Sequence, residues 1–172
     1  MKQRIELITN LVVIALAAFL VVAFARSGLA PWRKLAAPAS MKVGDTLPAI
    51  AGMNNAPGGT TLILAIRNGC HYCEDSMPFY AELAALHRAG KLKPALLAVL
   101  PDDAAVARAF LSENHVALPF SAGIPLDEIR VAGTPTLIWV NAQRRVLRAW
   151  VGEQPAAGQR AILAALTTEL KN

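Results

Sequence analysis

The sequence predicts an α/β fold, a mixed β-sheet with flanking helices, preceded by one N-terminal transmembrane helix. Three observations lead to this prediction. The 172-residue chain is 55% hydrophobic and 17% charged, a composition that suits one domain with a buried core and is unlike that of a disordered protein. After residue 41, short apolar runs of strand length alternate with stretches of helical periodicity. Before it, residues 11–25 form an apolar run without a charged residue.

Residues 1–26 are predicted to be a membrane anchor or a signal segment. As a helix, residues 5–25 would span roughly 31 Å, close to the thickness of about 30 Å of a bilayer core. The basic residues Lys2 and Arg4 before the run, and the small-x-small sequence at residues 23–25, also fit a cleaved signal peptide. Both alternatives place the rest of the chain on the periplasmic or extracytoplasmic side of the inner or cytoplasmic membrane.

The charge distribution favours a membrane over a nucleic acid as a partner. The formal net charge is +5. Residues 1–41 hold five basic groups and one acid, and residues 42–172 hold twelve basic and eleven acidic groups. The basic excess therefore flanks the apolar run, and no basic patch with interleaved aromatic residues follows. We expect no nucleic-acid partner.

The remainder divides into a linker and one domain. Residues 27–41 are rich in Gly, Pro, Ala and Ser, which is linker composition, and residues 42–172 are the predicted domain. Short apolar pairs broken by Gly, Pro and Asn at residues 43–60 indicate a strand fragment or a hairpin.

The first strands and helices of the domain follow from the apolar pattern. Residues 61–67 and 94–101 are continuous apolar runs, as expected for strands covered on both faces. Between them, the helical spacing after the cysteines ends at Gly90. Asp102 and Asp103 then begin a second predicted helix.

The second half of the domain is predicted in the same way. Residues 116–133 suggest a short strand and one or two helical turns near residues 126–131. Residues 135–152 read as two strands joined by a turn near residues 141–143, and residues 156–170 as a final helix. Strands joined by helices should be parallel and the last pair antiparallel, with helices on both faces of the sheet.

Both cysteines lie in the segment NGCHYCEDSMPFY, at positions 70 and 73. If Cys70 begins the helix, free N–H groups and the helix dipole stabilise its thiolate and lower its pKa below the ordinary value. Cys73, one turn further on, is then the shielded residue that resolves a mixed disulfide with Cys70. A half zinc site and a structural clip are the alternatives.

Neither alternative fits well. Zinc needs three or four ligands, and His71, His87 and His115 show no ligand spacing around the single C-x-x-C, so we expect no metal. A structural disulfide between the two cysteines would close too small a loop to contribute much to the stability of the fold. Within the redox interpretation, His71 and Glu74 are the candidate redox-tuning residues, because a protonated imidazole favours the thiolate and a carboxylate opposes it.

A strand, a C-x-x-C at a helix start, Pro78, and GTPT before a later strand together resemble the thioredoxin superfamily. The resemblance implies that Pro135 is a cis-proline facing the disulfide. It also implies that Thr134 offers backbone hydrogen bonds to a substrate chain.

Within that superfamily, residues 42–172 are similar to the membrane-anchored TlpA/ResA-like branch, also called redoxin-domain proteins. The grounds are the sequence VGDTLPAI, the apolar N-terminus and an extra stretch between residues 101 and 125. The resemblance implies an extracytoplasmic thiol–disulfide oxidoreductase without a cofactor that acts on protein thiols or disulfides, in some relatives during cytochrome c maturation. It also implies a membrane redox partner that resets the cysteine pair.

Two departures and two alternatives remain. Gly69 precedes the first cysteine where many relatives have an aromatic residue, and Leu64 occupies the strand position where thioredoxin itself carries an acid. The alternatives are a Sco-like copper-binding protein, for which His115 is the only candidate histidine, and a peroxiredoxin-like peroxidase, which would oxidise Cys70 to sulfenic acid.

Overall fold

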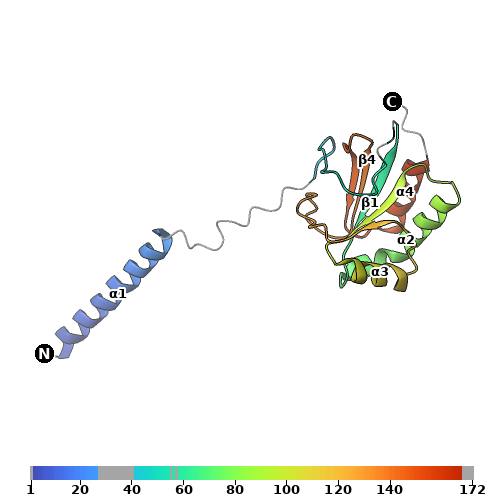
Figure 1. Ribbon diagram of the computed structural model, residues 1–172. Helices are drawn as coiled ribbons and strands as arrows, with labels where there is room; N and C mark the ends of the chain where they lie inside the picture. Colours follow the sequence, from blue (N-terminus) through green and yellow to red (C-terminus); the bar gives the residue numbers. More distant parts are fainter. Residues whose placement is uncertain (1, 27–40, 55, 57, 168–172) are drawn as a thin grey trace. The chain divides into compact units, whose positions relative to one another are not determined.

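The computed structural model describes residues 2–26, 41–54, 56 and 58–167, and the chain divides into two units, Met1–Ala37 and Pro38–Asn172 (Figure 1). Helix α1, Lys2–Arg26, belongs to the first unit. Among the described residues, no helix has both the length and the apolar composition needed to cross a membrane. The transmembrane helix expected at residues 5–25 is therefore not confirmed. The predicted linker, apart from residue 41, lies outside the described residues.

The second unit contains the predicted alternation of strands and helices. In chain order its elements are β1 (Thr60–Ala65), α2 (His71–Arg88), β2 (Ala95–Val99), α3 (Ala104–Glu113), β3 (Phe120–Ser121), β4 (Thr136–Asn141), β5 (Val146–Val151) and α4 (Ala156–Thr167). Each predicted long strand and helix is present.

The five strands form one mixed sheet in the order β3-β2-β1-β4-β5. Strand β1 pairs in parallel with β2 and antiparallel with β4, and β4 pairs antiparallel with β5. The expected parallel and antiparallel pairings are therefore confirmed. The short strand β3 adds to the parallel edge beside β2.

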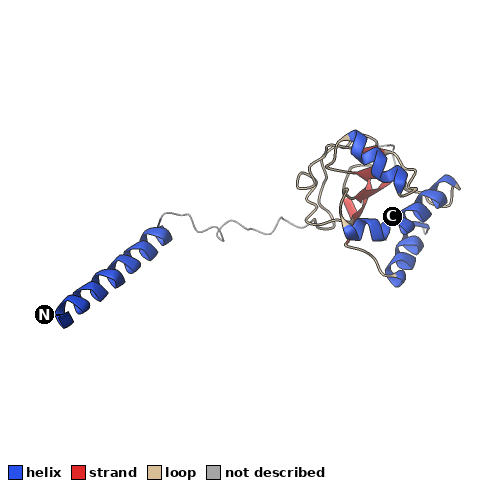
Figure 2. Cartoon of the chain, turned by 90° about the horizontal axis from the view of Figure 1, so that it is seen from below, coloured by secondary structure: helices blue, strands red, loops and turns tan. Residues whose placement is uncertain are grey.

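Alternating side chains of β1 contribute to two separate cores. Leu62 and Leu64 pack in the core that includes the buried residues of α2, α3 and α4. Ile63 and Ala65 pack in the core on the other face, which contains no residue of a helix. The expectation of helices on both faces is therefore wrong for the described residues. Figure 2 shows loops beside the strands, away from the helices.

Two non-helical segments cover that second face. Residues 126–131, expected to be helical, form successive turns that end at Arg130 with φ of 56°, although Ile129 and Val131 remain buried. A left-handed residue interrupts helical hydrogen bonding, which explains why no helix continues there. Of the two alternatives expected for the opening segment, a strand fragment or a hairpin, its described residues show no hairpin and only an isolated bridge between Thr46 and Arg145.

Candidate active site

The two cysteines lie at the start of α2, where β1 has just ended. Cys70 is the N-cap residue, in an extended conformation, and the N–H groups of Cys73 and Glu74 donate to its carbonyl oxygen at 2.9 and 3.0 Å. The Cys73 N–H also lies 3.3 Å from the Cys70 sulfur and points to it. The sulfur that sequence analysis assigned as the attacking atom therefore lies at a helix N-terminus and accepts from the Cys73 N–H, and the positive end of the helix dipole favours a thiolate there.

The cysteines form a disulfide, with their Cα atoms 5.2 Å apart. Their accessibilities differ in the expected sense, because Cys70 is 8% exposed and Cys73 is fully buried. Cys70 is therefore the less buried of the two cysteines, as the expected roles of an exchanging Cys70 and a resolving Cys73 require.

Thr134, 64 residues beyond Cys70, contacts the sulfur of Cys70, and Pro135 follows it in the chain. The Thr134–Pro135 peptide bond is cis, as the resemblance implied. The Thr134 hydroxyl donates to the Cys70 sulfur at 3.3 Å, and its carbonyl oxygen lies 3.7 Å from the same atom. This side-chain hydrogen bond was not expected, since only the backbone of Thr134 had been assigned a role.

Hydrogen bonds on both sides hold this loop in place. The Gly152 N–H donates to the Pro135 carbonyl at 2.7 Å, and the Thr136 hydroxyl donates to the Gly133 carbonyl at 2.7 Å. Pro135 is buried and Thr134 is half-buried. The position of the hydroxyl over the sulfur is thus set by β4 and β5, not by the helix that carries the cysteines.

The two redox-tuning candidates are both exposed residues of the first turn of α2. The His71 imidazole lies 3.3 Å from a carboxylate oxygen of Asp75, one turn further on, and the two side chains are 78% and 42% exposed. Glu74 contributes only its backbone N–H to the contacts described above. Asp75 is therefore the acid that faces His71, a pairing that the i, i+4 spacing alone predicts.

The turn that leads into Cys70 is fastened by a residue that sequence analysis did not assign to the site. The Asn68 N–H donates to the Asp102 carboxylate at 3.1 Å. Gly69 follows with φ of +68°, a left-handed conformation that side chains rarely adopt. The residue that stands where relatives carry an aromatic is therefore the one that lets the chain turn into the helix.

Behind the disulfide, the core supplies hydroxyls but no carboxylate at the expected strand position. Leu64 is fully buried. Ser76 and Tyr80 lie on the same buried face of α2 as Cys73, and the Ser76 hydroxyl donates to the Tyr72 carbonyl at 2.7 Å. Burial raises the pKa of Tyr80 to about 12, an effect that Glu153 adds to and Ser76 opposes.

Metal-binding side chains do not gather at the disulfide. Among the described residues, no three His, Cys, Asp or Glu side chains are placed to hold a metal ion. His115, the histidine that the copper-binding alternative requires, follows the end of α3 and lines a different pocket.

Comparison with known proteins gives relatives only at the level of structure. No family model and no curated protein matches the sequence. A chain from Chlorobium tepidum, provisionally described as thiol:disulfide interchange protein DsbE, is 24% identical with a TM-score of 0.56, covering 74% of this chain and 99% of that one.

Two further structures are similar. The thioredoxin domain of thiol-disulfide oxidoreductase BVU-2223 from Bacteroides vulgatus is 15% identical, with a TM-score of 0.57, over 75% of this chain and all of that one. StoA from Bacillus subtilis is 16% identical, with a TM-score of 0.51, and the match covers 74% of this chain and 96% of that one. The chain therefore shares its fold with these structures, one of which is a thioredoxin domain, and in this chain the C-x-x-C pair is Cys70 and Cys73.

Proposed function

We propose that this protein is a thiol–disulfide oxidoreductase that exchanges disulfides with protein cysteines through Cys70. The observation that carries the proposal is the disulfide at the N-terminus of α2, with an accessible Cys70 sulfur that accepts a hydrogen bond from Thr134 and a buried Cys73. The names of the structurally similar proteins support the same activity.

The exchange proceeds by two thiolate attacks. In the oxidising direction, a substrate thiolate attacks the Cys70 sulfur, the Cys70–Cys73 bond breaks, and Cys73 leaves as a thiolate that takes up a proton. A second substrate thiolate then attacks the substrate sulfur of the mixed disulfide, which releases reduced Cys70 and a substrate disulfide. The reducing direction is the reverse of these steps, with Cys73 as the resolving thiolate, and a membrane redox partner resets the pair.

The test is capture of the mixed disulfide. In the Cys73→Ala variant the resolving sulfur is absent, so substrate chains should remain bound to Cys70 and appear as higher bands on non-reducing gels that vanish with reductant. The matched control is Cys70→Ala, which should capture none, because Cys73 is buried. A folded Cys73→Ala variant that captures no chain contradicts the proposal, and the captured chains identify the substrate.

We place the domain outside the cytoplasm, attached to the inner or cytoplasmic membrane through residues 5–25. Support comes from α1, whose described large apolar side chains are exposed: Leu11, Val12, Val13, Ile14, Leu16, Phe19, Leu20 and Val22. An apolar surface of this kind requires an apolar environment. The full chain should stay in the membrane pellet after an alkaline wash, whereas a chain that begins at residue 42 should not. Recovery of a soluble product cut after Ala25 would instead identify a signal peptide.

Preparation of apocytochrome c thiols for haem attachment is the narrower proposal, and it rests on the resemblance to TlpA/ResA-like proteins. An apocytochrome c thiol pair captured by Cys73→Ala would support it, and capture of unrelated chains alone would contradict it. The copper-binding alternative is not favoured, because His115 lines a pocket that contains neither cysteine.

A further inference from the structure

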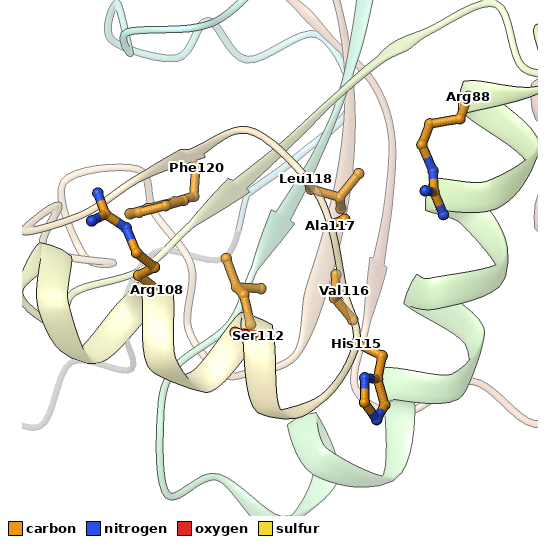
Figure 3. Close-up of a pocket in the computed structure, with 9 residues that line it drawn as sticks. Arg88, Arg108, Ser112, His115, Val116, Ala117, Leu118 and Phe120 are labelled. Atoms are coloured by element: carbon orange, nitrogen blue, oxygen red, sulfur yellow. The ribbon is translucent and has the colours of Figure 1, made fainter.

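A pocket of about 410 Å³ opens where α2, α3 and the segment that joins α3 to β3 come together (Figure 3). Its volume lies within the range of about 300–1,000 Å³ that is typical of small-molecule sites. Neither cysteine lines it, and neither do Thr134 and Pro135. Whatever the pocket binds is therefore held away from the disulfide.

The pocket has an apolar surface at its base. Leu111 of α3 and Val116 of the joining segment are each 3% exposed, and both line the pocket. Leu118 and the ring of Phe120 are half-buried and extend this surface. A ligand with an apolar ring or chain would remove these groups from water, which favours binding.

The other lining side chains carry positive charge that the described part of the chain does not neutralise. Arg88 and Arg108 both line the pocket, and none of the lining residues is an Asp or a Glu. Neither arginine forms an ion pair with a described residue. The guanidinium carbon of Arg108 lies 6.0 Å from the centre of the Phe120 ring, and Figure 3 draws the two side chains next to each other. That contact holds the cation beside the apolar surface.

A histidine completes the rim. Helix α3 ends in a Schellman motif, in which the His115 N–H donates to the Ser112 carbonyl at 3.0 Å and the Val116 N–H donates to the Leu111 carbonyl at 2.9 Å. His115 occupies the left-handed position, with φ of 56°, where glycine is favoured. The motif places this imidazole on the pocket.

We infer that this pocket binds an organic oxyanion, a molecule with a carboxylate or phosphate group beside an apolar ring or chain. Guanidinium groups bind both oxyanions through paired N–H donors, and the apolar base accepts the body of the molecule. Both arginines are exposed, so an uncharged molecule of the same shape would gain nothing from their charge. The inference is independent of the thiol exchange, because it uses none of the residues assigned to it.

Calorimetric titration of the full chain tests the inference with three probes: 3-phenylpropanoate, phenyl phosphate and the uncharged 3-phenylpropan-1-ol. At least one anion should bind with a Kd of about 1 mM or tighter, and the alcohol at least about tenfold more weakly. The anion that binds more tightly identifies which oxyanion the pocket prefers. Arg88→Gln and Arg108→Gln together should weaken anion binding by about tenfold or more.

Matched controls separate the pocket from a general charge effect. Arg148→Gln and Arg160→Gln together remove the same charge from exposed positions outside the pocket and should change the Kd by less than about twofold. Ala117→Trp keeps every charge but fills the pocket, and should also abolish binding. No binding of either anion, equal binding of the alcohol, or equal losses in the two double variants would overturn the inference.

Discussion

Replacing Thr134 by valine removes a side-chain hydroxyl that donates to the Cys70 sulfur, at 3.3 Å, while keeping the shape of the side chain. A hydrogen bond to a charged acceptor contributes roughly 1.5–3 kcal/mol. Only the part of this free energy that is gained in the thiolate and not in the disulfide affects the redox equilibrium, and for that part we take the lower limit, about 1.5 kcal/mol. The pH midpoint of Cys70 alkylation should then rise by about one unit.

The same free energy acts on the reduction potential. Because the lost hydrogen bond stabilised the reduced form, the Thr134→Val disulfide should become harder to reduce, by roughly 30 mV for a two-electron couple. Equilibration with glutathione buffers, at a pH where Cys70 is a thiolate, measures this shift. The rate of iodoacetamide reaction as a function of pH measures the midpoint.

Thr136→Val is the matched control in the same loop. The Thr136 hydroxyl donates to the Gly133 carbonyl and is buried, so its loss should lower the free energy of unfolding by about 1 kcal/mol. It should change the alkylation midpoint and the potential less than Thr134→Val does, because it loosens the loop but removes no contact with the sulfur. If Thr134→Val moves neither quantity, or if Thr136→Val moves them equally, the argument that Thr134 stabilises the thiolate is wrong.

Three further substitutions test the structure around the site. Between pH 10 and about 12 the unfolded chain loses a phenolic proton that folded Tyr80 keeps, so the free energy of unfolding should fall by roughly 3 kcal/mol as the pH rises. Urea titrations of Tyr80→Phe should show that most of this fall is gone. Asp102→Ala leaves the Asn68 N–H without its acceptor and should lower the free energy of unfolding by about 1 kcal/mol. Leu83→Ala, at a fully buried position of α2, should lower it by about 2–5 kcal/mol in the same assay.

Each of these has a control on the same element or at the same residue. Tyr72 is exposed, so Tyr72→Phe should leave the alkaline fall intact. Asp102→Asn retains an acceptor oxygen and should recover most of the free energy of unfolding that the alanine variant loses. Glu82, next to Leu83 but exposed, should tolerate alanine within about 0.5 kcal/mol. Equal effects in a variant and its control would contradict the assigned contact.

Features that depend on neighbours in the sequence could be predicted from it. The apolar alternation located the strands, and Asp103 caps α3 by accepting from the N–H groups of Ala105 and Val106, as the paired acids indicated. The position of Cys70 at a helix N-terminus likewise follows from the strand that ends just before it. These assignments need only local chemistry.

Features that depend on contacts between distant segments were missed. The helices were expected on both faces, but residues 126–131 turn instead of forming a helix, so loops cover one face. Asp102 lies 34 residues from Asn68 and carries no local sign of that contact. The parallel pairing of β1 and β2 could have indicated this contact. Asn68 follows β1 and Asp102 follows β2, and residues that follow neighbouring parallel strands meet at the same edge of the sheet.

The contact between Thr134 and Cys70 depends on the register of two antiparallel strands. Ala65 at the end of β1 pairs with Thr136 at the start of β4, which brings the residues just beyond both ends together. That register is fixed by burial, since Leu137 packs in the helix-covered core and Ile138 in the opposite one. A slip of one residue would exchange these faces and move Thr134 away from the sulfur. The chemistry assigned to Cys70 therefore depends on how the apolar side chains of β4 are buried on the two faces of the sheet.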